Sequence, residues 1–226
     1  MLTVAPDRDL VERLLRNGGL VCPRCETGVL GGHGWVPRRW LRRADGLVML
    51  LKAHATEQEM AGGKASGGLR RGRCRDAECR ATHVLVPPGM LARRLDEAEV
   101  IGAALLARAG GAGCRRISAR AGRPVSTVRG WLRRLEQNAP ALRAAFTGLV
   151  HRLDASPPVL TAGRGEAAEA VAAMGEAAAA VRRLLGTAMR ALSPWQVTAA
   201  VSHGGLLAVA APTRLFHTSR HLVTTM

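Results

Sequence analysis

The residues Gly122-Arg-Pro-Val-Ser-Thr-Val-Arg-Gly-Trp-Leu-Arg-Arg134 carry the clearest structural signal in this chain. Six residues after its opening glycine, an apolar face begins and continues at helical spacings of three, four and seven residues. That face consists of Val128, Trp131, Leu132 and Leu135. Because such spacing places side chains on one side of a helix, we predict a helix from about Pro124 to Glu136.

The residues before this stretch predict a second helix across a tight turn. Cys114–Ala121 places the small Ser118 where two crossing helices would approach each other, and Gly122 readily takes the positive φ that the turn needs. The pattern predicts a helix-turn-helix within residues 96–137, preceded by a helix over 96–109 with Asp96 as its N-cap. The residue after the turn glycine is Arg123, where an apolar residue is usual, and Val125 is expected to fill that place.

The outward side of the predicted helix-turn-helix is polar and rich in arginine. The N-terminal half of the second helix is the part that enters a DNA major groove, where Arg129 could bind a guanine edge with both guanidinium nitrogens. The later arginines and those of the first helix would contact phosphates. The predicted DNA contacts are Arg115, Arg116, Arg120, Arg123, Ser126, Thr127, Arg129, Arg133 and Arg134. An ordinary helical hairpin with a solvated arginine face is the alternative.

The charge of the chain fits a polyanionic partner. Of its 226 residues, 33 are basic and 17 acidic, which gives a net charge of +16. Neutralising phosphates with arginine releases condensed counterions and drives binding to nucleic acid. Only two of the basic residues are lysines, however, and richness in Ala, Gly and Arg is also typical of a GC-rich genome.

Two cysteine pairs predict a metal site. Cys22-Pro-Arg-Cys25 is a tight turn, and Cys74-x4-Cys79 is a wider one. Zinc takes four tetrahedral ligands, and two short cysteine turns can supply them. His83 is an alternative fourth ligand if Cys74 is not used, and four ordinary thiols remain the other interpretation. Cys114 stands apart from the pairs, and we expect it to be a small core residue.

The pairs lie in a predicted zinc-ribbon-like module over residues 1–95. We expect a helix over 7–16, a strand entering a cysteine turn over 20–25, a loop over 28–34 and a strand over 81–86. Residues 46–68 are a glycine-rich insertion with the composition of a flexible linker.

The last part of the chain, residues 138–226, is predicted to be an Ala-rich helical region. We expect helices over about 141–153, 165–186 and 194–207, and a frayed tail from about 211. An apolar stripe over 171–185 either packs within the chain or pairs two chains as a homodimer. Trp195 is expected to anchor the core. The fold class is therefore mostly α, with a small N-terminal β module, a helix-turn-helix core and a C-terminal helical bundle.

Several classes of protein are disfavoured. Charged residues interrupt the N-terminus, and no apolar run approaches the roughly 20 residues that span a bilayer, so a cytoplasmic, nucleoid-associated protein without a membrane partner is expected. The chain has no tyrosine, which excludes a tyrosine recombinase. It also lacks a set of strand-borne carboxylates for two metal ions and a glycine loop for phosphate. We therefore expect no enzymatic activity.

Four segments carry a resemblance to a family. They are Cys22-Pro-Arg-Cys25, Cys79-Arg-Ala-Thr-His83-Val-Leu-Val-Pro87, Glu99-Val-Ile-Gly102 and Gly122–Arg134. Together with Ser193-Pro-Trp-Gln196, they resemble uncharacterised actinobacterial proteins that combine a zinc-ribbon-like N-terminus with a homeodomain-like helix-turn-helix. Such proteins are often encoded beside insertion-sequence integrase genes. The resemblance implies DNA binding linked to a mobile element, and it extends over roughly residues 15–205.

The sequence thus predicts a zinc-containing protein that binds specific double-stranded DNA. It would mark element ends for a separate recombinase or transposase, or regulate transcription of the element. An alternative is a protein-interaction adaptor that holds the recombinase without reading DNA, and a third is a non-specific nucleic-acid chaperone. Binding that falls steeply with salt, or on Arg129→Ala, would favour DNA over the adaptor.

Overall fold

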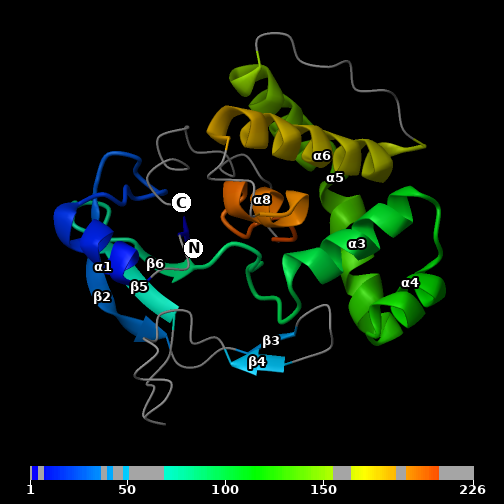
Figure 1. Cartoon of the computed structure of the whole chain (residues 1–226), viewed down its shortest axis with the longest axis horizontal. Coiled ribbons are helices and arrows are strands. Elements are labelled where there is room, and N and C mark those ends of the chain that lie inside the picture. The colour runs from blue at the N-terminus through cyan, green and yellow to red at the C-terminus, as the bar shows by residue number, and fades with distance from the viewer. Residues whose placement is uncertain are drawn as a thin grey trace. The chain divides into compact units, whose positions relative to one another are not determined.

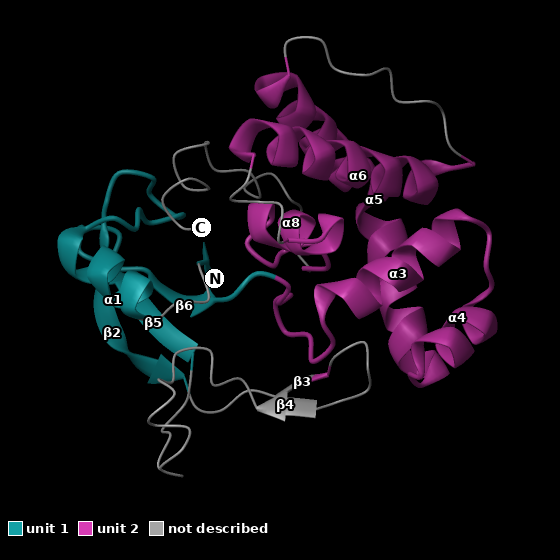
Figure 2. Cartoon of the chain, in the orientation of Figure 1, with its two compact units in different colours: residues 1–41, 48–88, 217–226 teal, residues 42–47, 89–216 magenta. Residues whose placement is uncertain are grey.

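The computed structural model describes residues 2–4, 8–36, 40–42, 48–50, 69–154, 164–186 and 192–208 (Figure 1). The chain forms two compact units (Figure 2). Unit 1 comprises residues 1–41, 48–88 and 217–226, and unit 2 comprises residues 42–47 and 89–216. The described part is mostly helical, with six helices and a four-stranded mixed sheet. Apart from residues 48–50, the predicted glycine-rich insertion lies outside the described residues, as does the predicted tail.

The two units divide the chain differently from the three segments expected from the sequence. The boundary follows Pro88 rather than residue 95, and residues 96–137 belong to the same unit as the helices that follow them. Helix α5 (Val125–Leu153) continues across residues 137 and 138 without interruption. The expected boundary therefore falls inside a helix.

Unit 1 is a small sheet with one helix packed on it. Its strands are β1 (Leu2–Thr3), β2 (Leu30–Val36), β5 (Leu69–Cys74) and β6 (Thr82–Val86), in the order β1-β6-β5-β2. β1 runs parallel to β6, and the other pairs are antiparallel. Helix α1 (Arg8–Asn17) contacts β2, and Leu15 and Leu30 are buried in the core. The predictions of α1 and β6 are confirmed to within one residue. β3 (Trp40–Arg42) and β4 (Val48–Leu50) form a separate two-stranded sheet.

The prediction of a loop over residues 28–34 was wrong, because most of this segment is strand β2. Its pairing with β5 places Gly31 opposite Arg73 and Gly32 opposite Gly72. A Cβ on Gly31 would lie 2.7 Å from Arg75 Nε, and one on Gly32 would lie 2.3 Å from Arg70 Nη2. These glycines therefore leave space for two guanidinium groups within a strand. The strand expected to lead into the first cysteine turn is reduced to one bridge, between Val21 and Val29.

Unit 2 is built from five described helices. Helices α3 (Ala98–Ala109), α4 (Cys114–Ala121) and α5 contact one another. Helix α6 (Glu166–Leu185) packs along α5, and α8 (Pro194–Val201) contacts α3 and α6 (Figure 1). The predicted apolar face of α5 is buried, with no member more than 5% exposed: Val128, Trp131, Leu132 and Leu135.

Pro140 does not end α5, contrary to the two helices expected around it. Proline lacks the N–H that would bond to residue 136, so an isolated helix would break here. In unit 2, Ala139 and Leu142 are buried beside the exposed Pro140, and Phe146 is buried one turn later. Packing of this face against α6 outweighs the missing hydrogen bond.

The predicted cap of α3 was also wrong. The N-cap is Glu97, whose side chain makes no capping bond, and Asp96 instead pairs with arginines. Cys114 is not a core residue either. It is the half-buried first residue of α4, and its Sγ lies 3.7 Å from the carbonyl oxygen of Val125.

The C-terminal helices pack within the unit. Most of the predicted α6 stripe is buried, namely Val171, Met174, Ala178 and Val181. The ring of Trp195 lies on Gly102 of α3, where an added Cβ would come within 2.0 Å of it, so Trp195 is a packing residue as expected. Ser193 and Gln196 form a capping box at the start of α8, which is shorter than predicted. None of the described helices is both long and apolar enough to cross a membrane.

Candidate metal centre and nucleic-acid interface

Two turns bring the cysteine pairs of unit 1 together. The first, Cys22–Cys25, is closed by hydrogen bonds from the Cys22 N–H to the Gly28 carbonyl and from the Glu26 N–H to the Cys22 carbonyl. The second begins with Cys74 at the end of β5. In it, the Asp76 carboxylate accepts hydrogen bonds from the N–H groups of Glu78 and Cys79. Because β2 pairs with β5, Leu30 lies opposite Cys74, and this register brings the two turns to the same edge.

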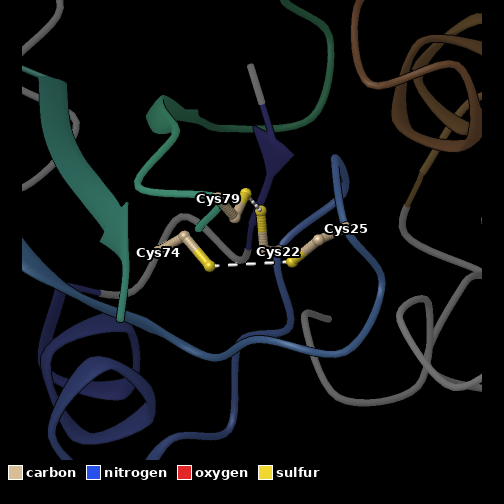
Figure 3. A group of neighbouring side chains, drawn as sticks. All are labelled: Cys22, Cys25, Cys74 and Cys79. Atoms are coloured by element: carbon tan, nitrogen blue, oxygen red, sulfur yellow. Dashed lines mark hydrogen bonds between the residues drawn. The ribbon is translucent and has the colours of Figure 1, made fainter. Parts of the chain in front are cut away.

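The four sulfur atoms face one another (Figure 3). The Sγ atoms of Cys22 and Cys79 are 3.7 Å apart, as are those of Cys25 and Cys74. All four lie within 4.8 Å of one another. A tetrahedral site with metal–sulfur bonds of about 2.3 Å has sulfur–sulfur edges of about 3.8 Å. The arrangement of these cysteines is therefore compatible with a metal ion such as zinc.

The backbone around the cysteines is shaped to the sulfur atoms. A Cβ on Gly28 would lie 2.5 Å from Cys74 Sγ and 3.2 Å from Cys25 Sγ. The N–H groups of Gly28 and Arg24 point at sulfur, 3.3 Å from Cys25 Sγ and 3.4 Å from Cys22 Sγ. Such donors stabilise thiolates, which are the form that binds metal.

The electrostatics of the four thiols also favour a bound cation. Hydrogen bonds from the backbone of Gly28 and Thr27 lower the pKa of Cys25 to about 6. Burial raises the pKa of Cys74 to about 12 and raises that of Cys22. The environment thus favours the thiolate form of Cys25 and opposes the thiolate forms of Cys74 and Cys22. Four thiolates this close together would repel strongly unless a bound cation neutralised them.

His83 lies beside the cysteines but outside their group. Its Nε2 is 3.4 Å from Cys22 Sγ, and the four-residue group that could hold a metal consists of cysteines alone among the described residues. Burial lowers the pKa of His83 to about 4, so the ring is neutral at pH 7. A neutral imidazole at this distance can orient the Cys22 sulfur, as outer-shell partners of metal ligands do. Of the two fourth ligands that the sequence left open, the geometry favours Cys74.

The second candidate site is the surface of α4 and the first half of α5. α4 ends at Ala121, its C-cap Gly122 has φ 60°, and α5 begins at Val125, so three residues separate the helices. The Ser118 hydroxyl donates to the Arg123 carbonyl at 2.6 Å and fixes the turn. Two helices joined by so short a turn are held at a defined angle, with the start of α5 exposed.

Most of the predicted DNA contacts are on this surface. Six are exposed: Arg115, Arg116, Arg120, Ser126, Arg129 and Arg133. Thr127 and Arg134 are half-buried. Arg123 differs from the rest, because its side chain is 9% exposed and its Nε lies 2.5 Å from Asp96 Oδ1. We therefore assign Arg123 to the structure of the turn.

The exposed arginines of α4 and of the first half of α5, namely Arg115, Arg116, Arg120, Arg129 and Arg133, have no carboxylate partner in the part of the chain that the structure describes. Elsewhere in unit 2, Arg108, Arg143 and Arg183 pair with Glu136, Glu169 and Asp154. Between Glu99 and Glu136 the sequence contains no acidic residue at all. The positive charge of this surface is therefore not neutralised locally.

A third feature, which was not predicted from the sequence, lies in unit 1. A cavity of about 480 Å³ opens beside the cysteine cluster and is lined by glycines, His33 and three arginines. Its arginines are Arg73, Arg75 and Arg80. The run of arginines at alternating positions 71, 73 and 75 was the available signal, because alternation in a strand places side chains on one face.

In comparisons with protein-family models, with curated proteins and with solved structures, nothing matches this chain.

Proposed function

We propose that this protein binds specific sequences of double-stranded DNA through a helix-turn-helix formed by α4 and α5. One observation carries the proposal: a three-residue turn presents the start of α5 beside arginines that no carboxylate neutralises among the described residues. A helical hairpin that served only for packing would not require exposed arginines without carboxylate partners. The absence of acids from residues 100–135 supports the same conclusion.

In this proposal α5 is the recognition helix. Arg129 is exposed in its first turns, where a side chain can reach base edges, and its guanidinium can form two hydrogen bonds with guanine. Ser126 is exposed one turn earlier on the same helix. Arg133 and the arginines of α4 would contact phosphates and fix the register of the protein on the duplex.

Zinc is the proposed ion of the cysteine centre, and its role is structural. Four cysteine ligands occupy every position of a tetrahedral ion, which leaves none for a substrate. The centre joins the turn after Val21 to the end of β5, and Cys22 and Cys74 belong to the core of unit 1. We interpret unit 1 as a zinc-ribbon-like module with an added helix.

The proposed role is that of an accessory factor of a mobile element or of a transcription regulator. The sequence resemblance to proteins encoded beside integrase genes suggests the former, with a recombinase or transposase as a partner. Site-specific binding serves both roles. The position of the binding sites, at element ends or in a promoter, distinguishes them. Half-sites with two-fold symmetry would indicate a homodimer.

The test is selection of bound sequences from a random duplex pool by the zinc-loaded protein, with metal content measured on the same preparation. We expect about one zinc per chain and an enriched motif. Arg129→Ala should weaken binding to that motif by about 1–3 kcal/mol and relax specificity at one base pair. The matched control is Arg152→Ala, because Arg152 is exposed on the same helix, far along the chain from the turn.

Each outcome distinguishes the proposal from its rivals. Metal without an enriched motif would favour the adaptor if DNA is not bound, or a non-specific chaperone if binding is salt-sensitive but independent of sequence. Equal losses from Arg129→Ala and Arg152→Ala would mean that charge alone governs binding. That result would contradict a recognition helix.

A further inference from the structure

Unit 1 contains a basic cavity that the helix-turn-helix proposal does not use. The cavity has a volume of about 480 Å³ and lies between β2 and the turn that holds Cys79. Gly31, Gly32 and His33 line it from β2, and Arg73, Arg75 and Arg80 line it from β5 and the turn. The glycines of this wall leave space for guanidinium groups, because a Cβ on Gly31 would lie 2.7 Å from Arg75 Nε.

The arginines of this cavity lack carboxylate partners in the described part of the chain. Arg75 donates from Nη2 to the Leu15 carbonyl at 3.2 Å, which leaves its charge uncompensated. Arg70, on the same strand but not in the cavity lining, contrasts with them, because its Nε is 2.6 Å from Glu12 Oε1. Glu12 thus neutralises the charge of Arg70, whereas the arginines that line the cavity remain available to bind an anion.

Neither nearby acid forms an ion pair with a cavity arginine among the described residues. The Asp76 carboxylate is engaged with the N–H groups of Glu78 and Cys79, and the Glu78 side chain is exposed. A zinc ion with four thiolates would carry a net charge of about −2. Compensation of that charge is a different reason for arginines close to the metal centre. That explanation predicts that removing them alters metal binding, whereas an anion site predicts that it does not.

The backbone of Arg80 belongs to the second cysteine turn. Its φ is 43°, in the left-handed region where glycine or asparagine is favoured, and its N–H bonds to the Asp76 carbonyl at 3.1 Å. An arginine is less stable than glycine in this conformation. Glu26, which follows Cys25 in the first turn, has φ 65°, so a left-handed residue after the second cysteine is common to both turns.

We propose that this cavity is an oxyanion site, formed by Arg73, Arg75, Arg80 and His33, and that it holds a backbone phosphate of the bound DNA. The second part of the proposal rests on the proposed function. Guanidinium groups bind phosphate oxygens through paired charge-assisted hydrogen bonds, which suits three arginines around one cavity. Unit 1 would then supply sequence-independent affinity while α5 supplies specificity.

The test uses the full zinc-loaded chain and three variants. Arg73→Gln/Arg80→Gln removes two charges from the cavity. Arg80→Gly removes one and relieves the backbone strain, so folding is preserved. Arg13→Gln/Arg16→Gln is the matched control, since both side chains are exposed on α1 of the same unit, outside the cavity lining.

The first measurement is a titration with inorganic pyrophosphate, followed through backbone amide shifts in NMR spectra. We expect saturable shifts at Gly31, Gly32 and Ala77 in the parent chain and in the control, and loss of saturation in both cavity variants, with zinc content unchanged. Absence of shifts in the parent chain would overturn the site. Loss of zinc from Arg80→Gly would overturn it in favour of charge compensation at the metal.

The second measurement is the salt dependence of affinity for the selected duplex. Arg73→Gln/Arg80→Gln should weaken binding about tenfold or more. It should also lower the slope of log K against log salt by about 0.9 for each phosphate that the variant no longer neutralises. A slope equal to that of the control would overturn the assignment to DNA phosphate. If the parent chain binds pyrophosphate but no DNA, the oxyanion site stands and the proposed function fails.

Discussion

The Arg123 guanidinium donates from Nε to Asp96 Oδ1 at 2.5 Å, and the two side chains are 9% and 3% exposed. Arg42 approaches the other oxygen of the same carboxylate, with Nη2 3.3 Å from Oδ2. The pair joins the segment before α3 to the turn between α4 and α5. It therefore fixes the position of the proposed recognition helix, and in the proposed helix-turn-helix it accounts for an arginine at a place that is usually apolar.

Breaking this pair should destabilise unit 2 strongly. Asp96→Ala leaves the Arg123 charge buried without its partner, and loss of one member of a buried pair costs about 3–5 kcal/mol. The free energy of unfolding, measured by urea denaturation with helical circular dichroism, checks the value. Glu136→Ala is the control, because its pair with Arg108 is 46% and 42% exposed and should contribute less than about 1 kcal/mol. Similar losses in the two variants would contradict a special role for Asp96.

The sequence predicted those elements whose signals are local. The spacing of apolar residues and the glycines at the ends predict α1, α4 and α6. The helical period of the apolar residues in α5 predicts its buried face. The four cysteines could be named because ligand spacing is a local property of each turn. Their mutual distances needed the pairing of β2 with β5, which no local pattern encodes.

The errors have a shared physical origin in contacts between distant segments. The strand through Gly31 and Gly32 exists because β5 pairs with it and its arginines need the space. α5 continues through Pro140 because α6 packs against it. Aspartate is a common helix N-cap, yet the buried Arg123 guanidinium is a stronger partner for the Asp96 carboxylate than a backbone N–H group. The alternating arginines of β5 were a local signal, but the cavity itself was not predicted, since its two walls come from segments far apart in the sequence.

Two glycine-to-alanine changes in unit 2 should change the stability of the protein in opposite directions. Gly102→Ala would place a Cβ 2.0 Å from the Trp195 ring and force α8 away, which should cost about 1–3 kcal/mol. Gly175→Ala, in α6, meets nothing within 4 Å and should stabilise the helix by up to about 1 kcal/mol. Thermal denaturation of the two variants measures the contrast. A neutral Gly102→Ala would show that Trp195 is not packed as described.

Gly28→Ala should weaken metal binding without removing a ligand. The new Cβ would lie 2.5 Å from Cys74 Sγ and 2.8 Å from Asp76 Cβ, so the second turn must move away from the first. Changes next to metal ligands typically reduce affinity about 10–100-fold, and the same range is expected here. Competition with a chromophoric chelator measures the affinity, and Gly175→Ala serves as the control. Unchanged affinity would mean that the cysteine turns do not form one metal site.

Removing the metal should unfold unit 1 and leave the helices of unit 2 intact. Cys22 and Cys74 belong to the core of unit 1, and the free energy of metal binding is folding free energy in so small a module. Hydrogen exchange after chelation should show loss of protection at the amides of β5 and β6. The amides of α3 and α5 should stay protected. Loss of protection in both units at once would mean that they fold as one cooperative body.

Glu99→Gln should stabilise unit 2 at pH 7 but not at pH 4. Burial raises the pKa of the Glu99 carboxyl above its ordinary value of 4.5, and Glu97 adds to the rise. Its Oε1 is buried and has no hydrogen-bond partner in the described residues. For a carboxyl whose pKa is higher in the folded state, stability is fully present below the unfolded pKa and falls as pH rises through the folded pKa.

The neutral amide should therefore remove a penalty that exists only when the carboxyl is ionised. Urea denaturation at both pH values measures the difference, with Glu166→Gln as the control because Glu166 is exposed at the start of α6. A stabilisation of equal size at both pH values would contradict a charge effect. A loss of stability at pH 7 would mean that the α3 helix dipole, which favours a negative charge in its first turn, outweighs burial at this position.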